Sequence, residues 1–141
     1  MVIQRWQTVF LFLATVLMVV FSLMPFASVT IDTEVVQLHP KDYPVYLVVN
    51  LLIASLLFIS IFKYRNLKMQ KKVTLLSVVL ICCSAVTGGM LLYGPGAPKG
   101  AVELEWAGGI VLLLAALLFA IFAYRGISSD QRKLSSNDRI R

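Results

Sequence analysis

Charged residues are scarce in this sequence. Asp, Glu, Lys and Arg together make up 14% of the 141 residues, whereas roughly a quarter of an average soluble domain is charged. Hydrophobic residues account for 59%, so too few polar side chains remain to cover the surface of a water-soluble domain. The composition therefore excludes an ordinary soluble protein, and the length is that of a single domain.

Histidine and cysteine are also scarce, which removes several kinds of site. His39 is the only histidine, so the chain cannot assemble a bis-histidine haem site or a typical zinc site. Cys82 and Cys83 are adjacent and would point about 100° apart on a helix. A disulfide between them is therefore not expected, and we predict that both are small packing residues. The sequence predicts no cofactor, no metal and no catalytic residue.

What the sequence does contain is four long apolar stretches without a single Asp, Glu, Lys, Arg or His. About 20 helical residues, at 1.5 Å each, cross the hydrocarbon core of a bilayer. Because lipid offers the backbone no hydrogen-bond partner, each stretch must be a helix. We predict an all-α membrane protein, a four-transmembrane-helix bundle formed by residues 1–141, with a cytoplasmic tail at 125–141. The predicted spans are residues 8–26, 45–62, 73–93 and 106–124.

The basic residues lie mainly on one side of these spans. Lys41 and Lys99 are on the other side, together with five acidic residues. The positive-inside rule places the basic side in the cytoplasm, which predicts a multi-pass protein with both termini inside. The alternative that the first stretch is a cleaved signal peptide with Arg5 before it stays open.

Two segments outside the spans have the pattern of strands. Residues 29–38 partly alternate apolar and polar side chains, and residues 101–106 alternate more regularly. Alternation with period two is typical of strands that are buried on one face. The two outer segments could therefore pair as a small two-stranded β cap over the helix ends.

The apolar stretches contain no Asp, Glu, Lys, Arg or His that could carry a charge or transfer a proton within the membrane. Proton relays, ion paths and intramembrane metalloproteases depend on such groups, so the sequence argues against them. A serine nucleophile needs a base within reach, and no stretch supplies one. We therefore predict that the protein is not an enzyme. The alternative is acid–base chemistry on lipid at the outer surface, which would use His39 and the outer carboxylates Asp32, Glu34, Asp42, Glu103 and Glu105.

Small and weakly polar residues recur at helical spacing along the predicted spans. Such stripes let helix backbones approach closely in lipid. They can serve packing within the bundle or the docking of a partner helix, and the sequence leaves both interpretations open. Asn50 is the most polar residue of any span. The candidate packing or partner face consists of Thr8, Thr15, Ser22, Ser84, Gly88, Gly109, Ala116 and Ala120.

The strongest cluster of charge is the basic connection between the second and third spans. It can fix the topology and attract anionic lipid, or it can dock an acidic cytosolic partner, and nucleic acid is not expected as a partner. The tail after residue 124 mixes both signs of charge, which suits a short interfacial helix or a disordered segment. The candidate residues for cytoplasmic docking or lipid contact are Arg5, Lys63, Arg65, Lys68, Lys71, Lys72, Arg139 and Arg141.

Three cytoplasmic segments carry a resemblance to a known family. They are Ile3–Thr8, Phe62–Gln70 and Asp130–Arg141. The chain resembles a family of small four-helix integral membrane proteins of unknown function from Bacteroidota. The resemblance implies a bacterial cytoplasmic (inner) membrane and no particular activity, cofactor or substrate.

The stripes of small residues on the spans and the basic residues on the predicted cytoplasmic side are both features that can bind other proteins. We therefore expect a non-enzymatic accessory or scaffold subunit of a membrane assembly, whose partners are the lipid bilayer and another membrane protein or further copies of this chain. The alternative is a small transporter or lipid-handling protein that acts as an oligomer, since several copies could line a path that four uncharged helices cannot.

Overall fold

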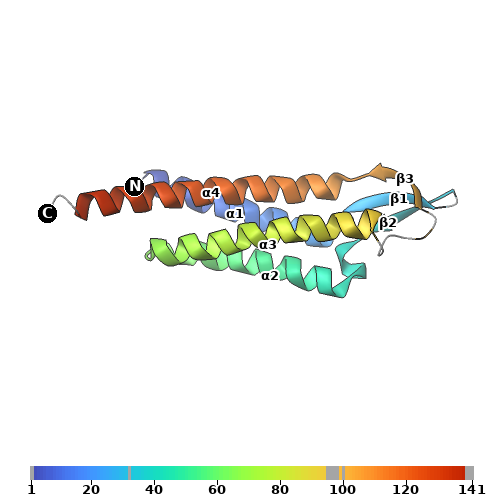
Figure 1. The fold of residues 1–141 in the computed structure, drawn as a ribbon, viewed down its shortest axis with the longest axis horizontal. Coiled ribbons are helices and arrows are strands. Elements are labelled where there is room, and N and C mark those ends of the chain that lie inside the picture. Colours follow the sequence, from blue (N-terminus) through green and yellow to red (C-terminus); the bar gives the residue numbers. More distant parts are fainter. Residues whose placement is uncertain (1, 32, 95–98, 100, 139–141) are drawn as a thin grey trace.

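Four long helices and three short strands make up the described part of the chain, residues 2–31, 33–94, 99 and 101–138, in a computed structural model (Figure 1). The helices are α1 (Val2–Leu23), α2 (Pro44–Phe62), α3 (Leu67–Tyr93) and α4 (Gly108–Asp138). The strands are β1 (Ala27–Ile31), β2 (Glu34–Leu38) and β3 (Ala101–Trp106), and a short 3-10 helix, η1 (Pro40–Asp42), precedes α2.

The helices lie side by side in one bundle. Helix α1 packs against α2 and α4, and α3 packs against the same two helices. The start of α1, the α2–α3 connection and the end of α4 lie at one end of the bundle, opposite the sheet (Figure 1). All four helices are long and apolar enough to cross a membrane, which confirms this part of the sequence-based prediction.

Local sequence sets the helix ends. Pro25 follows the end of α1 at Leu23, and the residue before a proline disfavours helical geometry. Helix α2 begins with Pro44, whose fixed φ suits the first position of a helix. Helix α3 starts earlier than the predicted span, because Asn66 caps it by accepting a hydrogen bond on Oδ1 from the Met69 N–H at 3.2 Å.

The tail that follows the fourth apolar stretch is helical. Helix α4 runs without interruption from Gly108 to Asp138, well past the end of the apolar run at Tyr124. Of the two alternatives for this segment, the structure therefore has a helix, and this helix is a direct continuation of α4.

The sheet forms the cap that the sequence suggested, with one strand more. Strand β1 is central and pairs antiparallel with β2 and β3. The pairing of the two predicted segments is thus confirmed, but the first segment belongs to a hairpin, so the sheet has three strands instead of two. The turn between β1 and β2 contains Thr33 at a φ of 81°, and positive φ is typical of tight hairpin turns.

The core runs through the bundle and into the sheet. Phe21 and Phe26 pack edge-on against the ring of Tyr46, with centroids 6.2 and 5.9 Å apart. The connection between α1 and β1 meets α4 at Gly109, where an added Cβ would collide with the backbone of Phe26. The core therefore joins the helices and the sheet. Its largest fully buried members include Leu11, Met18, Ile53, Leu57, Ile81 and Leu113.

Large apolar side chains also cover the outside of the bundle, including Val48, Phe58, Val86 and Leu118. An apolar outer surface on helices of this length is what lipid contact requires. Cys82 and Cys83 lie on this outer surface, since both are exposed and unpaired. The prediction that they are packing residues is therefore wrong for the single chain, because the face of α3 toward α2 and α4 falls one residue away, at Ile81 and Ser84.

Candidate functional site

A buried polar network joins α2 to α3 near the sheet. The Tyr46 hydroxyl donates to the Ser84 carbonyl at 3.1 Å, and the Ser84 hydroxyl donates to Asn50 Oδ1 at 2.7 Å. Asn50 Nδ2 donates in turn to the Tyr46 carbonyl at 2.8 Å. Gly88 leaves room for the tyrosine, because an added Cβ would lie 2.9 Å from its hydroxyl oxygen. The network consists of neutral groups that satisfy one another, so its evident role is to hold the two helices in register.

A second polar contact joins the same helices toward their connection. The hydroxyls of Ser60 and Thr74 lie 2.8 Å apart, and both residues are buried. Helices α2 and α3 are thus fixed by hydrogen bonds near both ends, which leaves α3 a stable support for the basic residues at its start.

Helices α1 and α4 are joined at the end of the bundle away from the sheet. Gln7 Nε2 donates to Asp130 Oδ2 at 2.7 Å, and Gln7 is almost fully buried. Gly126 makes this approach possible, since an added Cβ would lie 2.7 Å from Gln7 Cγ. The contact holds the extension of α4 beyond Tyr124 against the first turns of α1.

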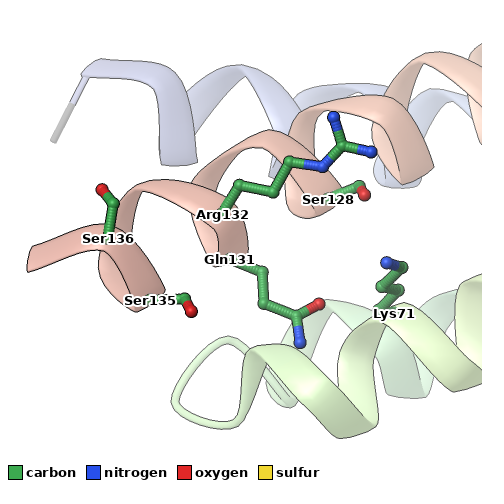
Figure 2. A pocket seen from close by; sticks show the side chains of 6 residues that line it. All are labelled: Lys71, Ser128, Gln131, Arg132, Ser135 and Ser136. Carbon is green, nitrogen blue, oxygen red and sulfur yellow. The ribbon is translucent and has the colours of Figure 1, made fainter. Parts of the chain in front are cut away.

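A cleft of about 420 Å³ opens between the start of α3 and the extension of α4. Figure 2 shows Lys71 reaching from α3 toward α4, while Gln131 reaches from α4 toward α3. The described residues that line the cleft are Lys71, Ser128, Gln131, Arg132, Ser135 and Ser136. We call this space the α3–α4 cleft.

A neighbouring hollow of about 390 Å³ shares Lys71, Ser128 and Arg132 with the α3–α4 cleft. It adds Tyr124, Arg125 and Ser129 to the lining. The ammonium nitrogen of Lys71 lies 5.6 Å from the centre of the Tyr124 ring, close enough for a cation–π contact. The aromatic ring therefore helps to keep the positive charge of Lys71 between the two hollows.

Donor groups dominate this region. Three of its described lining residues are basic, four are serines and none is acidic. Within the described part of the chain, Gln131 Oε1 is buried and has no hydrogen-bond partner. The Asp130 carboxylate is engaged with Gln7 instead. Cationic and hydroxyl donors around a hollow can bind an anion.

The small-residue face predicted from the sequence lies between helices of the same chain. Ser84 and Gly88 are buried on α3, Gly109, Ala116 and Ala120 are buried on α4, and Ser22 is buried on α1. Thr8 and Thr15 are half-buried on α1. The buried members are thus occupied by neighbouring helices in the single chain.

The basic candidates are spread over the end of the bundle opposite the sheet. Lys63, Arg65, Lys68 and Lys72 are exposed, whereas Lys71 is half-buried in the α3–α4 cleft. Arg5 lies in α1, and Arg139 and Arg141 lie outside the described residues.

The sequence-based prediction missed the α4 side of the cleft. Ser128, Gln131 and Ser135 recur at helical spacing, so they share one face of a helix. That signal becomes usable only when the tail is known to be helical.

Among the described side chains, no hydrogen bond joins the ring of the outer histidine to a carboxylate. The backbone N–H of His39 donates to Asp42 Oδ2 at 3.1 Å, so this carboxylate caps η1. In the part of the chain that is described, His39 Nδ1 is buried without a hydrogen-bond partner. Asp32 lies outside the described residues. The side chains of Glu103 and Glu105 lie outside the described part as well. The structure thus describes only the turn that His39 and Asp42 form.

Comparison with known protein families gives a match over nearly the whole chain. The family described as "Domain of unknown function (DUF4293)" matches residues 3–140. No curated protein and no solved structure matches the chain.

Proposed function

The chain belongs to the DUF4293 family, and we propose that it is a non-enzymatic accessory or scaffold subunit of a larger assembly in a bacterial cytoplasmic membrane. Four helices of sufficient length and apolarity support the membrane location. The excess of lysine and arginine at the end opposite the sheet supports an orientation with this end in the cytoplasm. The resemblance of the cytoplasmic segments to proteins of Bacteroidota supports a bacterial origin.

The extension of α4 is the observation that carries the scaffold role. This helix has 31 residues, about 46 Å at 1.5 Å per residue, against a hydrocarbon core of about 30 Å. The remainder forms a helical projection that Gln7 holds in place through Asp130. A projection that is already ordered loses little conformational entropy when a partner binds.

The surface of this projection combines charge with an exposed apolar side chain. Leu134 is 57% exposed and follows the exposed basic residues Arg132 and Lys133. A partner with an apolar contact surrounded by acidic groups would complement it. The projection is therefore where we expect another subunit of the assembly to dock.

In-cell cross-linking, purification in mild detergent and mass spectrometry test the scaffold role. The wild-type chain should retain a stoichiometric membrane or cytosolic protein, and Leu134→Asp should lose it. Val35→Asp is the matched control, since Val35 is 54% exposed but lies in β2 at the opposite end. A wild-type chain that purifies alone, or equal loss in both variants, would contradict the scaffold role.

A small transporter or lipid-handling protein acting as an oligomer is the second candidate. The α3–α4 cleft favours this function. Its hydrogen-bond donors lie just beyond Tyr124, where the apolar run of α4 ends, so they would be at the level of the lipid headgroups. Purification as a homo-oligomer, together with flux or lipid transfer in liposomes, would support this function. A monomer without either activity would exclude it.

A further inference from the structure

We propose that the α3–α4 cleft is a binding site for a phosphate group, supplied by the headgroup of an anionic phospholipid in the cytoplasmic leaflet. The inference rests on the proposed membrane location and is independent of the scaffold role. It assigns a ligand class to a defined place in the fold, beyond the general attraction between basic residues and a membrane.

The charges of the cleft come from two helices. Lys71 belongs to the second turn of α3, whereas Arg132 lies on α4 beside Ser128 (Figure 2). Arg125 lines the adjoining hollow. A phosphate between these side chains would receive charge-assisted hydrogen bonds, which are about twice as strong as neutral ones.

The ammonium group of Lys71 is positioned at the cleft by its contact with Tyr124. This group lies 5.6 Å from the centre of the Tyr124 ring, and the Lys71 side chain is half-buried. The nearby Lys68 and Lys72 are exposed. Burial therefore distinguishes Lys71 from the neighbouring basic residues, whereas Arg132 across the cleft is exposed.

The uncharged groups of the cleft suit a headgroup. Ser128 and Ser135 lie on one face of α4 with Gln131 between them, and their hydroxyls can donate to phosphate oxygens. The buried amide oxygen of Gln131 has no donor among the described residues. A hydroxyl-bearing headgroup such as phosphoglycerol can supply that donor, while its phosphodiester meets Lys71 and Arg132.

The level of the cleft along the bundle favours a lipid as the source of the phosphate. The apolar run of α4 ends at Tyr124, and that of α3 begins at Val73, two residues after Lys71. Both helices therefore leave the hydrocarbon where the cleft begins. Phospholipid phosphates occupy this layer, and tyrosine is enriched there.

The test measures how ligands raise the melting temperature of the delipidated full chain in detergent. The ligands are phosphatidylglycerol, phosphatidylcholine and inorganic phosphate. Lys71→Gln with Arg132→Gln removes two charges from the cleft. Lys72→Gln with Lys133→Gln removes two exposed charges that do not line it, and is the matched control. Lys71→Arg with Arg132→Lys keeps the charges in place.

We expect the wild-type chain to prefer phosphatidylglycerol to phosphatidylcholine. A hydrogen bond to a charged group contributes about tenfold or more in affinity, so the cleft variant, which removes two charged donors, should bind phosphatidylglycerol about 100-fold more weakly. The control removes exposed charges outside the cleft and the charge-preserving variant keeps both charges, so each should change the affinity by about fivefold or less. The unliganded melting temperature shows whether each variant folds.

Each other outcome has a defined meaning. Stabilisation by inorganic phosphate that is lost in the cleft variant, without a preference for phosphatidylglycerol, would keep the phosphate site and reject a lipid source. Equal losses in the cleft variant and its control, or no stabilisation of the wild-type chain by any anion, would overturn the site. Absence of the protein from cellular membrane fractions would instead reject the proposed membrane location.

Discussion

Gln7 and Asp130 are 123 positions apart in the chain, yet the amide of Gln7 donates to the carboxylate of Asp130 at 2.7 Å. The bond fastens the extension of α4 to the first helix, beyond the end of the apolar run. Gly126 permits it, since an added Cβ would lie 2.7 Å from Gln7 Cγ. Both the helical projection of α4 and the α3–α4 cleft depend on where this part of α4 lies.

Asp130→Ala should therefore destabilise the bundle. The variant leaves the buried Gln7 amide without its acceptor, and an unsatisfied buried donor costs about 1–3 kcal/mol. Unfolding of the purified chain in detergent by added SDS measures the change in free energy. Ser129→Ala is the control, because Ser129 is exposed on the same turn. Equal stability of the two variants would show that the hydrogen bond contributes nothing.

The polar network between α2 and α3 predicts that Ser84→Ala lowers the free energy of unfolding by less than Asp130→Ala does. The variant removes the donor to Asn50 Oδ1 inside the bundle. Hydrogen bonds between membrane helices contribute on average about 0.6 kcal/mol and at most about 1.7 kcal/mol. Thr87→Ala, whose hydroxyl bonds only to the carbonyl of Cys83 at an exposed position, should change stability by less. A reversed order of the two effects in the same SDS titration would contradict the role of Ser84.

Two glycines make a matched pair for testing the contact between α4 and the connection from α1 to β1. An alanine Cβ at Gly109 would collide with the backbone of Phe26, whereas one at Gly89 would meet nothing within 4 Å. Overpacking costs about 1–3 kcal/mol, so Gly109→Ala should lower the melting temperature in detergent. Gly89→Ala should leave it unchanged or raise it slightly. If both variants melt like the wild-type chain, the connection before β1 does not pack tightly on α4 at this point.

Contacts within the chain limit the use of bulky substitutions on α4 as tests for a partner helix. Gly109 and Ala116 are buried against other parts of the chain. Leucine at either position would therefore disturb folding before it reported on a partner helix. Exposed positions such as Leu134 are the appropriate ones for testing subunit contacts.

The helices could be predicted from the sequence because the bilayer imposes a simple requirement. A long apolar run without charge has to satisfy its own backbone, and residues 45–62 and 73–93 did become helical. The strand pattern of residues 101–106 was also readable, since its alternation is local. In both cases neighbouring residues carry the whole signal.

The remaining features depend on contacts between distant parts of the chain. The hairpin that adds a third strand turns at Thr33, and no strong two-residue turn signal such as Asn-Gly marks that position. The α3–α4 cleft combines Lys71 with residues of a tail whose helical state was open. Which of several similar lysines becomes half-buried is decided by the packing of α4 on α3, and the sequence around Lys71 does not encode it.

The orientation of the bundle gives the last prediction. The basic residues at the α2–α3 connection and on the extension of α4 predict that this end is cytoplasmic, so the sheet faces the opposite side. Cys82→Ser with Cys83→Ser gives a background without cysteine. In that background, Lys41→Cys should react with a membrane-impermeant maleimide on intact spheroplasts, since Lys41 is exposed in η1. Ser129→Cys, exposed on α4, should react only after the membrane is opened.

The opposite labelling pattern would show that the bundle has the inverse orientation, with the phosphate site in the outer leaflet. Labelling of both positions on intact spheroplasts would show a mixed orientation, which the distribution of basic residues does not predict.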